Sequence, residues 1–127
     1  MPSKPLIVAE ATHGAWGGAV YVYPPGATTC WNCVELSVRD GIESLPQSDD
    51  SGVIQPPGCA EPTFTGAGFD LSEIALQAVR AVVAQLLTAS EATTIYKVEL
   101  RDTAGVRIPP QWITRMPKPN PACGISH

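Results

Sequence analysis

The sequence has few charged residues, no run of basic residues and no long apolar stretch, and each shortage argues against a class of protein. Only 16% of its 127 residues are charged, against about 25% in a typical soluble domain. The formal net charge is −4, and the Lys and Arg residues are scattered. This argues against nucleic-acid binding, because phosphate contacts require concentrated positive charge. A surface so poor in charge indicates that part of it is normally covered.

No segment has the pattern of a membrane span or a targeting signal. The apolar run at residues 6–9 is shorter than the ~7–15-residue core of a signal peptide. The longest apolar stretch, residues 71–87, is interrupted by polar side chains, so it is amphipathic rather than lipid-facing. We therefore expect no membrane partner and a cytoplasmic location. In that compartment the four cysteines favour metal ligation or thiol reactivity over disulfides.

The first third of the chain predicts two strands. The length suits one domain, 1–127, and 44% hydrophobic residues support a core. The continuous apolar run at residues 6–9 predicts a strand buried on both faces, as in a parallel sheet. Residues 19–23, which are β-branched and aromatic, predict the second strand. From residue 34 to 69 we find no helix or strand period, so we expect a long irregular connector.

The last half of the chain predicts one long helix and further strands, so the fold class is α/β. Asp70 and Glu73 have the form of a capping box. Apolar residues then recur at three- and four-residue steps, which predicts a helix over about 70–88. The strands expected after it cover residues 94–100, 106–108 and 112–115, the last two separated by two prolines. Residues 116–127 form a Pro-rich tail that carries a cysteine.

The spacing of the cysteines favours a metal site. Cys30 and Cys33 form a C-x-x-C pair, which can place both sulfurs on one side of a tight turn around a tetrahedral Zn²⁺. A redox pair is the alternative, but such pairs open a helix after a strand, and we expect no helix after Cys33. Cys123 lies in a tail with little else to anchor it, which a metal would do. The fourth ligand would be His127 or Cys59.

Cys59 also has the surroundings of a reactive thiol. It lies in the connector between proline-rich stretches, so we expect it to be accessible. Because only the thiolate is nucleophilic, something must lower the pKa of this group. No Lys or Arg lies between Arg39 and Arg80, so an activating cation would have to come from elsewhere in the fold or from another chain.

The order of these motifs resembles the C-terminal half of the ThiF/MoeB-type adenylyltransferases, the superfamily of the ubiquitin-activating enzymes. Four segments carry the resemblance over almost the whole chain: a strand and glycine turn (5–18), a Pro-Gly-x-x-x-Cys-x-x-Cys zinc knuckle (25–33), a crossover-loop cysteine ahead of a helix (58–87), and a terminal cysteine motif (121–124). The resemblance implies a partial Rossmann-like α/β fragment with a crossover-like connector.

Such enzymes use Mg-ATP to adenylate the C-terminal glycine of a ubiquitin-like or sulfur-carrier protein. In some members the crossover cysteine then receives the acyl group or sulfur. By this resemblance Cys59 is the catalytic nucleophile, and Cys30, Cys33 and Cys123 are structural zinc ligands. Ser126 stands where the family has a fourth cysteine, which leaves His127 or Cys59 to complete the site. The resemblance also leaves room for a homodimer.

The ATP-binding half of such an enzyme has no counterpart in this sequence. No Gly-x-Gly-x-x-Gly loop opens a helix, so no phosphate site is expected. We therefore expect the chain to be inactive alone and to need the missing half as a partner. Two other functions remain open: a non-catalytic interaction module held together by zinc, and a thiol redox or sulfur-relay protein that uses Cys30 and Cys33.

Overall fold

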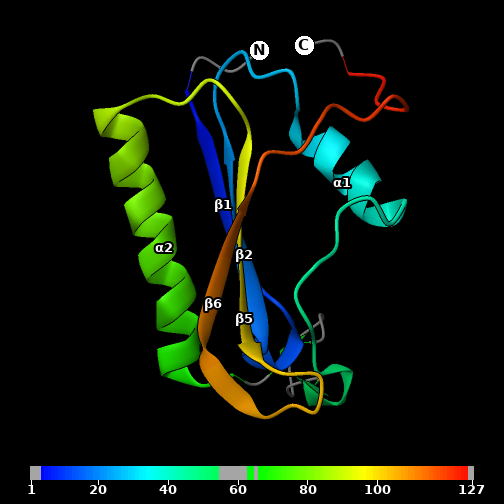
Figure 1. Cartoon of the computed structure of the whole chain (residues 1–127), viewed down its shortest axis with the longest axis vertical. Helices are drawn as coiled ribbons and strands as arrows, with labels where there is room; N and C mark the ends of the chain where they lie inside the picture. Colours follow the sequence, from blue (N-terminus) through cyan, green and yellow to red (C-terminus); the bar gives the residue numbers. More distant parts are fainter. Residues whose placement is uncertain (1–3, 55–62, 65, 126–127) are drawn as a thin grey trace.

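The fold is built on one antiparallel sheet with a helix on each face. The computed structural model describes residues 4–54, 63–64 and 66–125. Its main sheet has the strand order β1-β2-β5-β6, and each pair is antiparallel. The strands are β1 (Leu6–Ala11), β2 (Gly17–Tyr23), β5 (Thr94–Arg101) and β6 (Arg107–Arg115). Figure 1 shows α2 (Gly68–Leu87) and α1 (Trp31–Arg39) on opposite sides of this sheet.

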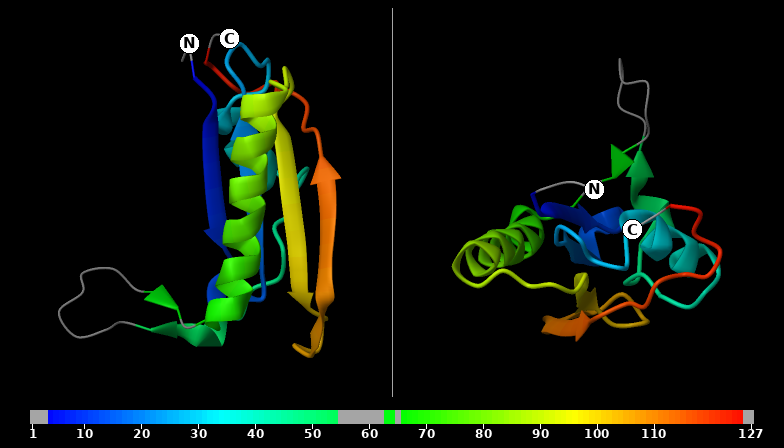
Figure 2. Two further views of the ribbon diagram at one scale, coloured as in Figure 1. Left: turned by 90° about the vertical axis from the view of Figure 1, so that its left-hand side faces the viewer. Right: turned by 90° about the horizontal axis from the view of Figure 1, so that it is seen from above.

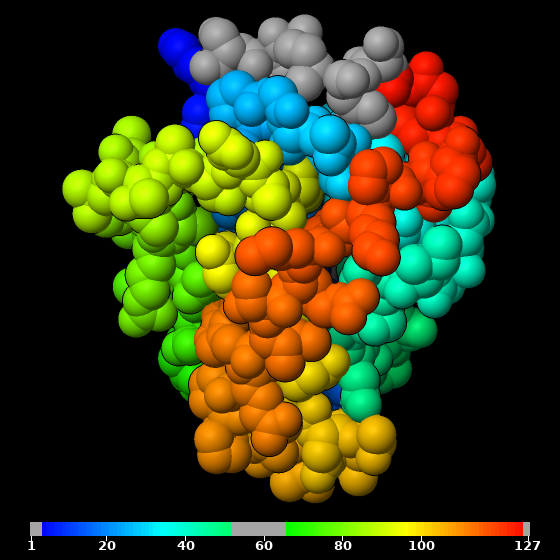
Figure 3. Space-filling model, turned by 45° about the horizontal axis from the view of Figure 1, so that its top comes forward, coloured from blue at the N-terminus to red at the C-terminus, as the bar shows by residue number. Residues whose placement is uncertain are grey.

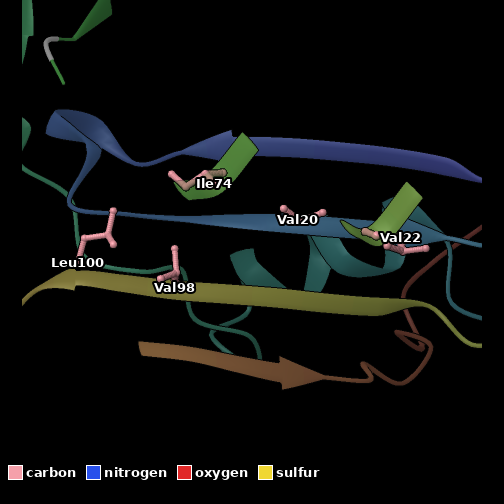
Figure 4. Packing of buried hydrophobic residues seen from close by; sticks show 6 residues of the cluster. Val20, Val22, Ile74, Val98 and Leu100 are labelled. Atoms are coloured by element: carbon pink, nitrogen blue, oxygen red, sulfur yellow. The ribbon is translucent and has the colours of Figure 1, made fainter. Parts of the chain in front are cut away.

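The alternation of side chains along β2 creates two cores. Val20 and Val22 face α2, where they pack with Ile74 and, from β5, Val98 and Leu100; Figure 4 shows this cluster. The intervening residues point to the other face, where they meet α1 in a second cluster of Ala19, Tyr21, Val34 and Ile95. Because successive strand residues point to opposite faces, a strand between two helices is buried along its whole length.

The prediction of a first strand buried on both faces, in a parallel sheet, is wrong. β1 lies at the edge of the sheet, antiparallel to β2, and most of its residues are exposed. The strands buried on both faces are the two inner ones, β2 and most of β5. A short apolar run fits either position, since the pattern shows what a strand can bury and not which neighbours cover it. The expected Rossmann-like character is not confirmed by the described strands.

The connector expected at residues 34–69 is wrong in its first part. α1 begins at Trp31 and continues to Arg39. The available signal was Val34 and Val38, four residues apart, both of which pack on the sheet. The rest of the described connector contains a short 3-10 turn at Asp50–Gly52 and a two-stranded pair, β3 (Val53–Ile54) with β4 (Thr63–Phe64).

The long helix and the 94–100 strand are confirmed, but the predicted capping box is wrong. α2 begins at Gly68, after an N-cap at Ala67 that makes no side-chain cap bond. Asp70 instead accepts a 2.6 Å bond from the Arg107 guanidinium, and Glu73 accepts a 3.0 Å bond from the indole N–H of Trp112. Both acids therefore tie α2 to β6 rather than closing the helix end.

The two strands expected on either side of Pro109 and Pro110 are one continuous strand, β6. β6 lies at the other edge of the sheet. Proline is tolerated in an edge strand because the missing N–H would have faced solvent. The prediction of two separate strands, 106–108 and 112–115, is therefore wrong.

Gly18 sets the distance between α2 and the sheet. A Cβ at Gly18 would lie 2.4 Å from Ile74 Cδ1 and 2.7 Å from the Glu10 carbonyl oxygen. We expect Gly18→Ala to lower the free energy of unfolding by about 1–3 kcal/mol, because the helix or the strand must shift. Gly68 is the matched control, since a Cβ there meets nothing within 4 Å. Urea denaturation of both variants checks this, and equal stability of Gly18→Ala and wild type would contradict it.

Candidate metal centre

Two of the predicted zinc ligands lie where α1 begins. The chain leaves β2 through a turn at Pro24–Gly26 and enters α1, with Cys30 at the N-cap in extended conformation. Cys33 lies in the first turn of the helix and is fully buried. The two Sγ atoms are 3.8 Å apart. The C-x-x-C pair is therefore held by a helix start, not by the tight turn alone that its spacing suggested.

The tail brings the third sulfur to this pair. Cys123 Sγ lies 3.6 Å from Cys30 Sγ, although the two residues are 93 positions apart. Figure 3 shows the tail, in red, lying against the cyan surface around α1. The tail contains neither helix nor strand from residue 116 to 125, so its position depends on individual contacts.

Hydrogen bonds from the side chains of Thr29 and Asn120 fix the path of the tail. Thr29 donates to the Pro117 carbonyl oxygen at 2.9 Å. Asn120 is buried and donates from its amide to Ser37 Oγ on α1 at 3.2 Å. The Asn120 side-chain oxygen accepts from the Ala122 N–H at 2.9 Å, and its main-chain carbonyl accepts from the Cys123 N–H at 3.0 Å. Asn120 therefore both anchors the tail and forms the turn that presents Cys123.

The last residue of β6 directs the tail toward α1. Arg115 lies 2.9 Å from a carboxylate oxygen of Glu43, and Lys97 lies 3.6 Å from the other oxygen. Glu43 is 5% exposed and follows α1 in the chain. This buried carboxylate therefore links the loop after α1 to β5 and to the start of the tail.

Two of the three sulfur–sulfur distances, 3.8 Å for Cys30–Cys33 and 3.6 Å for Cys30–Cys123, are close to those of a tetrahedral zinc site. All three ligand atoms lie within 4.8 Å of one another. In a tetrahedron with Zn–S bonds of about 2.3 Å, neighbouring sulfurs lie about 3.8 Å apart. Three thiolates are soft ligands that suit Zn²⁺ and disfavour Mg²⁺ or Ca²⁺. Cys30, Cys33 and Cys123 could therefore share a soft metal ion, and this donor set suits Zn²⁺.

The surroundings favour thiolate at one sulfur and thiol at another. Burial raises the pKa of Cys30, although the Cys33 backbone N–H opposes this. The Asn32 side-chain amide, which donates to Cys123 Sγ at 3.3 Å, lowers the pKa of Cys123 to about 7. A donor of this kind orients a metal ligand and tunes its basicity. Neither Asn32 nor Asn120 was singled out from the sequence, since an isolated Asn carries no pattern.

Two other predicted site residues lie outside the described residues. Cys59 and His127, the candidates for the fourth ligand, both fall there. The same holds for Cys59 as the predicted nucleophile. Among residues 4–54, 63–64 and 66–125, the metal-ligating group consists of Cys30, Cys33 and Cys123.

The prediction that no helix follows Cys33, which disfavoured a redox pair, is also wrong. α1 begins at Trp31 and follows strand β2. A helix N-terminus ordinarily lowers the pKa of a nearby cysteine, but here burial dominates at Cys30 and the pKa is raised. The position of Cys30 at the start of a helix is therefore compatible with a redox role, but the raised pKa of Cys30 does not favour one.

Comparison with known proteins gives two relatives. No protein-family model matches the chain, and no solved structure shows significant similarity to it. The chain is 34% identical over 122 residues to uncharacterized protein y4oA of Sinorhizobium fredii, and 34% identical over 127 residues to uncharacterized protein y4qC of the same organism. Each match covers 94% of this chain but only 21% and 22% of the relatives. The chain thus spans about a fifth of their length.

In the part of the chain that the structure describes, no helix could span a membrane.

We expect one zinc per chain in the purified protein. Cys30→Ser, Cys33→Ser and Cys123→Ser should each lose most of it, because each removes one of three sulfurs that share the ion. Inductively coupled plasma mass spectrometry gives the zinc content. Cys59→Ser identifies the fourth ligand: retained zinc would leave Cys59 free as a nucleophile, whereas metal loss would make Cys59 a ligand and exclude it as a free nucleophile.

Asn32→Leu should weaken zinc binding about 10-fold, since it removes the amide that donates to Cys123. Competition with a chromogenic chelator measures the affinity. Arg39→Ala, at the exposed far end of α1, should bind zinc as the wild type does. Equal affinities of Asn32→Leu and wild type would show that the amide is not a partner of the ligand.

Proposed function

We propose that this chain is the C-terminal, zinc-bearing part of a ThiF/MoeB-type adenylyltransferase. The observation that carries the proposal is the convergence of Cys123 with Cys30 and Cys33. The family resemblance implies this contact between a knuckle after the second strand and a terminal cysteine. The C-x-x-C spacing and the position of Cys123 in the tail also predicted a shared metal, and the contact joins residues 93 positions apart.

The relatives support the proposal through their length. They are nearly five times as long as the segment that they share with this chain, which leaves ample room for an ATP-binding half. In this proposal the Rossmann-like, parallel part of the fold and the Mg-ATP site belong to that half. The antiparallel sheet of the present chain continues it, and the enzyme acts in the cytoplasm.

The residues of this chain have two roles in the proposed enzyme. Cys30, Cys33 and Cys123 hold a zinc that joins the start of α1 to the tail, with His127 or Cys59 as the fourth ligand. Such an ion contributes folding free energy and no chemistry of its own. Cys59 is the candidate nucleophile if it is not a ligand.

The proposed reaction begins at the C-terminal glycine of a ubiquitin-like or sulfur-carrier protein. The glycine carboxylate attacks the α-phosphate of ATP, so that an acyl-adenylate forms and pyrophosphate leaves. The Cys59 thiolate would then attack the acyl carbon, forming a thioester as AMP departs. The activation step requires the ATP-binding half, so the present chain does not perform it alone.

ATP–pyrophosphate exchange tests this function. We expect intact y4oA to incorporate labelled pyrophosphate into ATP only when a carrier protein with a C-terminal glycine is present, and the 127-residue chain to give none. A carrier that lacks its last glycine is the control. Zinc-loaded y4oA without exchange, tested against the ubiquitin-like carriers of its own organism, would contradict the activity and favour a non-catalytic zinc module.

A thiol redox function is the second candidate, and the position of Cys30 at the start of a helix favours it. This function requires a reversible Cys30–Cys33 disulfide. Peptide mapping after oxidation with glutathione disulfide, with and without bound zinc, distinguishes the redox function from the zinc knuckle. A Cys30–Cys33 disulfide in zinc-free protein as purified would support the redox function and contradict the zinc knuckle.

A further inference from the structure

Helix α2 has an apolar face that its own sheet does not cover. Ile74 and Ala81 point into the core. On the opposite side, Leu76, Val79, Val83 and Leu86 follow one another at steps of three, four and three residues, and their exposed fractions are 51%, 59%, 47% and 79%. A surface helix normally carries charged or polar residues on this side. A helix that is apolar on both faces is typical of a protein interior.

The free edge of the sheet lies beside this helix. α2 packs mainly on β1 and β2, and β1 is an edge strand in the described sheet. In Figure 2 the β3–β4 pair also projects from the body on the β1 side.

We propose that this surface, the β1–α2 face (the open edge of β1 together with Leu76, Val79, Val83 and Leu86 on the outer side of α2), is where the remaining part of a longer polypeptide docks. The occupant would add a strand to the open edge of β1 and cover the outer face of α2 with an apolar groove. The proposal rests on the proposed function for one point only, the identity of that occupant as the ATP-binding half.

The area of the face favours a tethered partner over a second copy. A helix of 20 residues is about 30 Å long and roughly 10 Å wide, so two copies of α2 packed together would bury about 600 Å² in total. Stable complexes of separate proteins bury about 1,200–2,000 Å², whereas domains of one chain stay together with about 600–1,500 Å². The face is therefore too small for a stable dimer through α2 and large enough for a covalently connected half.

The composition and the relatives agree with this occupant. The outer face of α2 carries Arg80 as its exposed charge, so it offers little to a charged ligand. The two relatives match nearly the whole chain and extend it almost fivefold. The low overall charge, 16% of residues, is what a segment buried within a larger protein requires.

Hydroxyl-radical footprinting with mass spectrometry compares the exposure of this helix in the 127-residue chain and in intact y4oA. We expect Leu76, Val79, Val83 and Leu86 to be oxidised rapidly in the chain, and the matching helix of y4oA to react at least tenfold more slowly. The control is β6, where Ile113 is 54% exposed, and the matching strand of y4oA should react at a rate similar to that of β6 in the chain. Equal rates at the helix would overturn the proposal.

Sedimentation velocity of the chain alone tests the second copy as occupant. We expect wild type, Val79→Glu and the control Ile113→Glu all to be monomers. A wild-type dimer that Val79→Glu dissociates and Ile113→Glu does not would overturn the proposal, because another copy of the chain would then cover α2. Footprinting does not depend on ATP. A protected helix without pyrophosphate exchange would refute only the proposed activity, and exchange with an exposed helix would refute only the docking surface.

Discussion

The meeting of three sulfurs at the start of α1 is the constraint on which the end of the chain depends. The tail has no helix or strand of its own, so it cannot be held by a hydrogen-bond ladder. Asn120 and Thr29 position it, and the sulfur cluster closes the link between the tail and the turn after β2. A metal ion shared by the three thiolates would strengthen this contact, because metal–sulfur bonds would replace the core that a segment so rich in proline cannot build.

In the rest of the molecule, the strands and helices of the small sheet are buried to different extents. β2 is covered on both faces, whereas β1 and the outer side of α2 remain open to solvent. The side chains left open are mainly apolar, and the ion pairs are concentrated elsewhere, around Glu43 and Asp70. This distribution and the low charge of the sequence are what the proposed docking of the β1–α2 face against a longer polypeptide would require. The cysteine cluster and the β1–α2 face lie in different parts of the fold, so we assign them separate roles.

Some predictions from the sequence failed for identifiable physical reasons. α1 was missed because a nine-residue helix contributes few apolar positions, and two valines are too weak a period to stand out. Asp70 and Glu73 have the residue types of a capping box, yet Arg107 and Trp112 compete for the same carboxylates and win through contacts distant in sequence. Pro109 and Pro110 suggested a break because the edge position of β6, which tolerates them, is a property of the whole sheet.

The sequence by itself determined the α/β class, the long helix expected over about 70–88, the strands expected at 19–23 and 94–100, and the C-x-x-C pair of Cys30 and Cys33. These features depend on local periodicity and residue chemistry, which act over a few neighbouring positions. The sequence also offered Cys123 as a third ligand, but only the tertiary structure decided that its sulfur reaches the pair, which strands are central, that the sheet is antiparallel, and that Cys30 opens a helix. Those outcomes depend on contacts between residues up to 93 positions apart, whose formation depends on the packing of the whole chain.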